Sequence, residues 1–143
     1  MKMIRFKKAV YTLPLLFGSL THTDSVAKIQ KYAQSKYNLK LPIDSFWGAP
    51  TNSLWNGGRP PYYIDSTIGD WTKQYYKNID AHKYLTYTNY LAGDYLNDSV
   101  SNLSLEMLSK DDGVIITDER LYKYIRKTYP KLKTKASVVK ITK

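Results

Sequence analysis

Cysteine is absent from the 143 residues of this chain. Its absence excludes disulfide bonds, cysteine nucleophiles, iron–sulfur clusters and zinc sites built on thiolates. Histidine is nearly as scarce, because the chain has only His22 and His82. They lie far apart in the sequence, and no carboxylate stands at a spacing that would complete a metal site with either of them. We therefore predict neither a metal nor any other cofactor.

The sequence motifs of the common enzyme classes are also missing. There is no G-x-G-x-x-G, no Walker loop and no G-x-S-x-G elbow, and neither histidine stands with a serine in the context of a nucleophile. Asp118 and Glu119 are adjacent, so on a helix they point in different directions, which does not suit a pair of catalytic carboxylates. We assign no catalytic residue, and the sequence favours a binding protein over an enzyme.

No apolar run approaches the roughly 20 residues that a membrane-spanning helix needs, and we expect no membrane partner. The first 27 residues nevertheless have two interpretations. Four basic residues, the apolar stretch 9–20 and the small residues 25–27 are typical of a secretory signal peptide. Tyr11, Pro14 and Gly18 interrupt that stretch, however, and residues 9–17 also fit a buried first strand. We favour the strand, and with it a cytoplasmic protein.

Charge is distributed unevenly along the chain. The formal net charge is +10, from 22 basic and 12 acidic residues. All of the excess lies near the ends, because residues 1–23 and 121–143 contain basic residues and no acidic ones. This asymmetry predicts either an anionic partner or a basic face that only keeps the protein in solution. The candidate nucleic-acid contacts are Lys123, Arg126, Lys127, Lys131, Lys133 and Lys135.

Strand and helix patterns alternate along the chain. Strands are expected at residues 9–17, 39–47, 82–88, 114–117 and 134–141. Helices are expected to begin near residues 24, 70, 91 and 118, each of the four lying between two of these strands. Such alternation is typical of a parallel sheet with right-handed crossovers. We predict one α/β domain over residues 1–143 with a mainly parallel sheet, of which half a TIM barrel is one form.

The loops that follow the strands are the expected ligand sites, because ligands of parallel sheets bind beyond the carboxyl ends of the strands. The loop 48–63 is the most informative one. Arg59 can hold a carboxylate or phosphate with its planar fork, whereas Trp47 and Trp55 would alternatively fold the loop onto the core. Asp118 has the alternative role of a helix cap. The candidate ligand-binding residues are Asn52, Asn56, Arg59, Asn89 and Asp118.

Three segments together carry a resemblance. They are residues 55–59, with the sequence Trp-Asn-Gly-Gly-Arg, residues 87–89 and residues 118–130. Over about residues 40–140 the chain resembles the N-terminal half of uncharacterised bacterial and phage TIM-barrel-like proteins, loosely those of the U32 peptidases. The resemblance implies about half of the eight βα units of a barrel. Half a barrel exposes two sheet edges, so such a chain would have to pair with a second copy, cover its edges or refold into an open sheet.

Two functions from different classes remain open. The first is a non-enzymatic basic protein that binds nucleic acid or a nucleoprotein, because tyrosines that can stack on bases alternate with basic residues in 122–129. Size, composition and the resemblance then favour an accessory protein of a phage or another mobile element, such as an inhibitor of a CRISPR nuclease. The alternative is a half-barrel enzyme or small-ligand-binding protein that uses the loops around Arg59. A homodimer is compatible with both.

Overall fold

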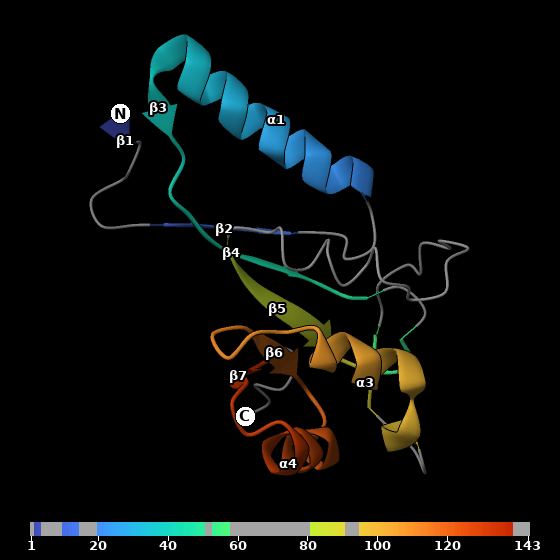
Figure 1. Cartoon of the computed structure of the whole chain (residues 1–143). Coiled ribbons are helices and arrows are strands. Elements are labelled where there is room, and N and C mark those ends of the chain that lie inside the picture. Colours follow the sequence, from blue (N-terminus) through green and yellow to red (C-terminus); the bar gives the residue numbers. More distant parts are fainter. Residues whose placement is uncertain are drawn as a thin grey trace.

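Five parallel strands form the main sheet of this computed structural model, which describes residues 2–3, 10–14, 20–50, 53–57, 81–90 and 95–138. The strand order is β2-β4-β5-β6-β7, so the strands lie side by side in the order of the sequence (Figure 1). The predicted α/β fold with a mainly parallel sheet is therefore confirmed. The strands are β2 (Tyr11–Pro14), β4 (Ile43–Gly48), β5 (His82–Tyr87), β6 (Gly113–Ile116) and β7 (Lys133–Ala136).

A second, smaller sheet pairs β1 (Lys2–Met3) with β3 (Leu39–Lys40), also in parallel. The strand expected over residues 39–47 is thus divided between two sheets. Residues 41 and 42 separate its two parts, and Pro42 has no N–H for a ladder bond. Its carbonyl instead accepts a hydrogen bond from Tyr11 N at 2.8 Å, which ties the start of β2 to this connection.

The helices lie between successive strands, with boundaries that differ from the prediction. α1 (Leu20–Tyr37) begins four residues before the expected start near residue 24. Of the helix expected to begin near residue 91, the described residues show the 3₁₀ turn η1 (Tyr95–Asn97) and then α3 (Ser99–Glu106), which Asp98 caps. α4 (Glu119–Thr128) begins after Asp118, as predicted. The helix expected near residue 70 lies outside the described residues.

The sequential strand order decides which face of the sheet is covered. Right-handed crossovers that always step in the same direction place their helices on one face. On that face, which we call the helix face, Leu85, Tyr87, Val114 and Ile116 of the strands pack against the two last helices. The helices contribute the fully buried side chains Leu105, Leu121 and Ile125.

The opposite face of the sheet has a different composition. Side chains alternate between the two faces along a strand, and residues paired in register share a face. Tyr84 and Thr86 of β5 therefore lie on the opposite face with Ile115 of β6 and Lys135 of β7. The other described strand residues of that face are Thr12, Pro14, Ser45, Trp47, His82, Gly113 and Lys133.

A buried ion pair fixes the amino-terminal ends of three strands. Lys83 of β5 and Asp112, just before β6, are 6% and 2% exposed, and their Nζ and Oδ2 atoms lie 3.1 Å apart. The Asp112 carboxylate also accepts hydrogen bonds from Lys83 N and Ser109 N, both at 2.8 Å. Its backbone carbonyl accepts from Lys133 N at 3.0 Å, at the start of β7.

We expect Asp112→Ala to lower the free energy of unfolding by about 3–5 kcal/mol, because it leaves the Lys83 ammonium buried without a counter-charge. Urea denaturation measures the change. The neighbouring Asp111→Ala is the matched control. Asp111 is half exposed and 3.8 Å from Lys133, so its loss should cost less than about 1 kcal/mol. Equal effects of the two substitutions would show that the buried pair has no special role.

Candidate functional site

The last helix positions a row of basic side chains toward solvent. In α4, Leu121 and Ile125 are four residues apart and fully buried, so they fix the face that packs on the sheet. Lys123 and Lys127 are also four residues apart, and they lie on the other side of the helix, exposed. We call the exposed set around them the basic surface of α4. It consists of Arg120, Tyr122, Lys123, Arg126, Lys127 and, in the turn after the helix, Lys131.

Hydrogen bonds to α3 hold this helix in place. Asn102 Oδ1 accepts from Tyr124 Oη at 2.7 Å and from Tyr129 Oη at 3.2 Å. The amide nitrogen of Asn102 donates to the carbonyls of Leu96 and Asp98 at 3.0 and 2.9 Å. Burial raises the pKa of Tyr129, and the nearby Tyr124 and Glu106 raise it further. The Tyr129 hydroxyl therefore stays protonated at neutral pH and remains a donor to Asn102.

Few acidic groups offset the charge of this region. Residues 119–136 contain seven basic side chains and one acidic side chain, a formal net charge of +6. Glu119 pairs with Lys123 at 3.2 Å, but both side chains are about 70% exposed, so water screens the pair. Lys127 and Lys131 form no ion pair with the described part of the chain. They are the cations most available to an anionic partner.

Arg126 has a structural role that its neighbours lack. Its Nη1 donates to the carbonyl of Pro130 at 3.3 Å and to that of Leu132 at 3.4 Å. These contacts tie the helix to the turn between α4 and β7, because both carbonyls lie beyond the end of the helix. A partner that binds Arg126 would therefore compete with this turn.

The sheet separates the six predicted nucleic-acid contacts into two groups. Lys123, Arg126, Lys127 and Lys131 belong to the basic surface of α4. Lys133 and Lys135 pair in register with Gly113 and Ile115, and so lie on the opposite face of the sheet. The sequence could not show this separation, because it depends on the side on which α4 packs.

Tyr84 gives Lys135 a defined position on the opposite face. The Lys135 ammonium lies 3.6 Å from the centre of the Tyr84 ring, a cation–π contact. The ring reaches across Gly113, where a Cβ atom would lie 2.9 Å from Tyr84 Cε1 and would clash with the carbonyl oxygen of Lys133. Glycine at 113 therefore allows this close approach of ring and backbone.

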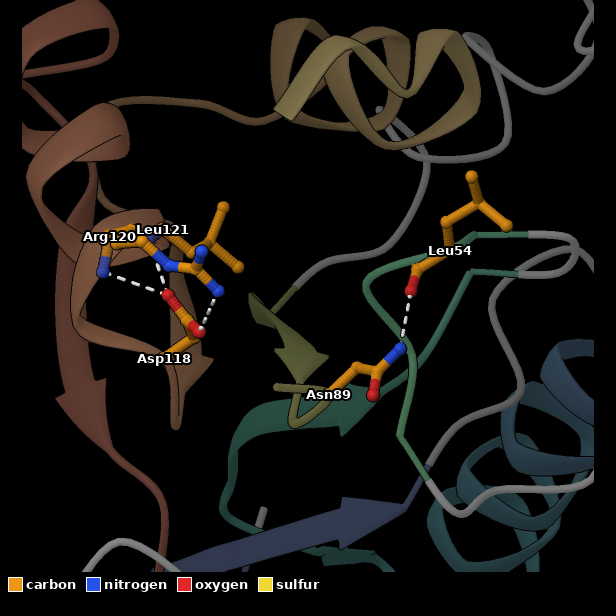
Figure 2. A network of polar contacts seen from close by, with 5 residues as sticks. All are labelled: Leu54, Asn89, Asp118, Arg120 and Leu121. Carbon is orange, nitrogen blue, oxygen red and sulfur yellow. Dashed lines mark hydrogen bonds and ion pairs between the residues drawn. The ribbon is translucent and has the colours of Figure 1, made fainter. Parts of the chain in front are cut away.

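The strand-end loops are held together by the residues predicted to bind a ligand. Asn89 Nδ2 donates to the carbonyl of Leu54 at 2.9 Å (Figure 2), and Asn89 N donates to the carbonyl of Trp55 at 3.1 Å. Trp55 is fully buried, and its Nε1 donates to the carbonyl of Tyr95 at 2.6 Å. This part of the loop is thus folded onto the core, as the second interpretation of Trp55 expected.

Asp118 likewise serves its own helix. Its Oδ1 accepts from Arg120 N at 2.8 Å and Leu121 N at 3.1 Å, and its Oδ2 lies 3.2 Å from the Arg120 guanidinium (Figure 2). Among the other candidates, Asn56 is half-buried beside this loop. Asn52 and Arg59 lie outside the described residues, so ligand binding at these positions stays a prediction.

Two threonines that are not among the predicted ligand-binding residues are unusual in the structure. Thr86 Oγ1 and Thr117 Oγ1 are buried and have no hydrogen-bond partner among the described residues. The only signal in the sequence is their place near the ends of two strands. Within the described ranges we also find no cluster of three acidic or histidine side chains that could hold a metal ion. No helix among them has the length and apolarity to cross a membrane.

Comparison with known proteins returned no match to a protein-family model, to a curated protein or to a solved structure. The resemblance to TIM-barrel-like proteins therefore stays a prediction, and the chain's own geometry carries the functional argument.

We expect Asp118→Ala to lower the free energy of unfolding by about 1 kcal/mol, because α4 loses the acceptor of two backbone N–H groups in its first turn. Urea denaturation again gives the value. Glu119→Ala is the control, since it removes a carboxylate one residue later but only an exposed pair, worth a few tenths of a kcal/mol. An Asp118→Ala variant as stable as the parent chain would mean that the carboxylate has another role than capping.

Proposed function

We propose that this protein binds nucleic acid through the basic surface of α4. The observation that carries the proposal is a helix with four exposed basic side chains, followed by Lys131, which forms no ion pair with the described residues. Phosphates neutralised by such side chains release condensed counterions, and this release drives association without reading the base sequence. The lysines act as point charges, whereas Arg120 can add a bidentate contact to a phosphate.

Tyr122 adds an aromatic group to the same surface. It is 44% exposed and stands between Lys123 and the first turn of α4. Exposed tyrosines next to cations can stack on unpaired bases, which contributes about 1–3 kcal/mol per base. Tyr124 and Tyr129 do not serve this purpose, because their hydroxyls are engaged by Asn102. The arrangement therefore favours single-stranded over duplex nucleic acid.

Two more specific predictions, the biological role and the homodimer, do not rest on the basic surface of α4. An accessory role in a phage or another mobile element, including inhibition of a CRISPR nuclease, stays a prediction from size and composition. A homodimer also stays a prediction. Its support is that β2 and β7 end the five-stranded sheet within the described part of the chain, because such edges present unpaired backbone groups.

We expect Lys123→Glu/Lys127→Glu to weaken binding of a fluorescein-labelled single-stranded oligonucleotide by at least about tenfold at low salt. Two lost phosphate contacts should also reduce the slope of log K against log salt by about 1.4, at about 0.7 for each contact with a single strand. Fluorescence anisotropy over a salt series measures both quantities. Neither lysine makes a contact that the fold needs, so the double variant should keep its stability.

The matched control is Lys28→Glu/Lys31→Glu on α1. It changes the net charge by the same amount, and both lysines are exposed. The α1 variant should retain most of the affinity if α4 forms the interface. An equal loss in both variants would attribute binding to net charge alone, and no salt-dependent binding by the parent chain would reject the proposed function.

A further inference from the structure

α1 is buried far less than the other α-helices that the structure describes. None of its side chains over residues 25–37 is buried, and only those of Val26, Gln30 and Ala33 are half-buried. They mark the side that packs on the rest of the chain, where Gln30 Nε2 donates to the carbonyl of Leu41 at 3.3 Å. α3 and α4, which lie away from α1 (Figure 1), each have fully buried side chains. Because helices in proteins owe most of their stability to a packed face, α1 has an outer side that a partner could cover.

Large apolar side chains line one exposed flank of α1. Ile29 and Tyr32 are 58% and 54% exposed, and residues three apart are neighbours on a helix surface. The ring of Tyr37, also exposed, meets that of Tyr32 edge to face with the ring centres 6.0 Å apart. Lys36 Nζ donates to Tyr32 Oη at 2.7 Å and lies over both rings. These contacts hold the rings in place, which lowers the entropy that they would lose on binding. We call Ile29, Tyr32, Lys36 and Tyr37 the α1 stripe.

The spacing of the α1 stripe is that of a contact between two helices. Positions 25, 29, 32 and 36 follow one another in steps of four and three, the steps at which apolar residues repeat where two helices pack. Ile29 and Tyr32 occupy the two central positions, and the aliphatic stem of Lys36 extends the apolar line. Since the two tyrosine rings are packed edge to face against each other, the stripe suits the side chains of a helix better than the flat faces of stacked bases.

Lysines give the surroundings of the α1 stripe a positive charge. Residues 25–43 contain four lysines and no acidic residue. All four are exposed, and none forms an ion pair within the described part of the chain. The same helix of a second copy would bring its own lysines to the contact, and like charges oppose association. The charge therefore favours a partner of the opposite sign. The four lysines are Lys28, Lys31, Lys36 and Lys40.

We propose that the α1 stripe is a docking site for an acidic amphipathic helix of a partner protein. Apolar side chains of that helix would cover Ile29 and Tyr32, as in complexes in which a helix docks through residues three and four apart. Its carboxylates would flank this line and meet Lys28 and Lys36, whose charges α1 leaves uncompensated. The site is separate from the basic surface of α4, because α1 and α4 lie apart (Figure 1).

The first test uses a fluorescein-labelled helical peptide that has leucine at the seam positions and glutamate at the flanking ones. Fluorescence anisotropy measures its binding to the full chain. We expect it to bind at least about tenfold more tightly than a peptide of equal charge with serine in place of leucine, and than a peptide with lysine in place of glutamate. No binding of the acidic leucine peptide would overturn the proposal, and so would an equal affinity for either comparison peptide.

The double variant Ile29→Gln/Tyr32→Gln locates the peptide on the α1 stripe. We expect it to weaken binding of the acidic leucine peptide by at least about tenfold, because it removes the apolar centre of the contact. Both side chains are exposed and glutamine is a good helix former, so α1 should keep its structure. Leu54→Gln/Tyr122→Gln is the matched control, since it removes an aliphatic and an aromatic side chain of similar exposure elsewhere. An equal loss in the control would reject the α1 stripe as the site.

Lys123→Glu/Lys127→Glu separates this site from the α4 interface. We expect this double variant to lose oligonucleotide binding and to keep its affinity for the acidic leucine peptide. If the affinity for the peptide is lost with it, the peptide binds the basic surface of α4, and the docking site on α1 is rejected. If the parent chain binds the peptide but no oligonucleotide, the docking site stands and the nucleic-acid function fails.

Sedimentation velocity of the parent chain tests the other occupant of the α1 stripe, a second copy of the chain. We expect Ile29→Gln/Tyr32→Gln to leave the oligomeric state unchanged. A parent dimer that this variant converts to a monomer would show that the stripe binds a second copy, which would overturn the proposal.

Discussion

The ion pair between Lys83 and Asp112 is the contact on which the carboxyl-terminal part of the sheet depends. Two charges taken out of water are tolerated only when the remaining donors and acceptors are also satisfied. Here the carboxylate accepts from two backbone N–H groups and from the ammonium, so one side chain joins β5, the turn before β6 and, through its own carbonyl, β7. The register of these strands then decides which side chains share a face.

The two faces of the sheet differ in composition, because the sequential strand order places the helices on one of them. Helices on one face supply an apolar core around Leu105, Leu121 and Ile125, and the buried polar groups nearest this core are paired, as Ser104 is with the carbonyl of Val100 at 2.8 Å. α4 is therefore amphipathic: its apolar side chains face this core and its cations face solvent. The opposite face carries more hydroxyl and aromatic groups, and several of them, among them Ser45, Tyr84 and Thr86, are buried as well.

The alternation of strands and helices was predictable from the sequence because it rests on local periodicity. The strand at His82–Tyr87 and the cap at Asp118 follow from patterns within a few residues. The start of α1, the division of residues 39–47 between two sheets and the burial of Lys83 depend on contacts with distant segments, which no local pattern contains. The charge of residues 121–143 was visible in the sequence, but its separation by the sheet into two groups was not.

Stability alone does not explain the arrangement of polar groups at the carboxyl ends of the strands. Asn89 and Asp118 stand where ligands of parallel sheets usually bind, yet their side chains are engaged with the loop at Leu54 and with the first turn of α4. Thr86 and Thr117 are buried and have no such partners among the described residues, and an unpaired buried hydroxyl costs free energy of folding.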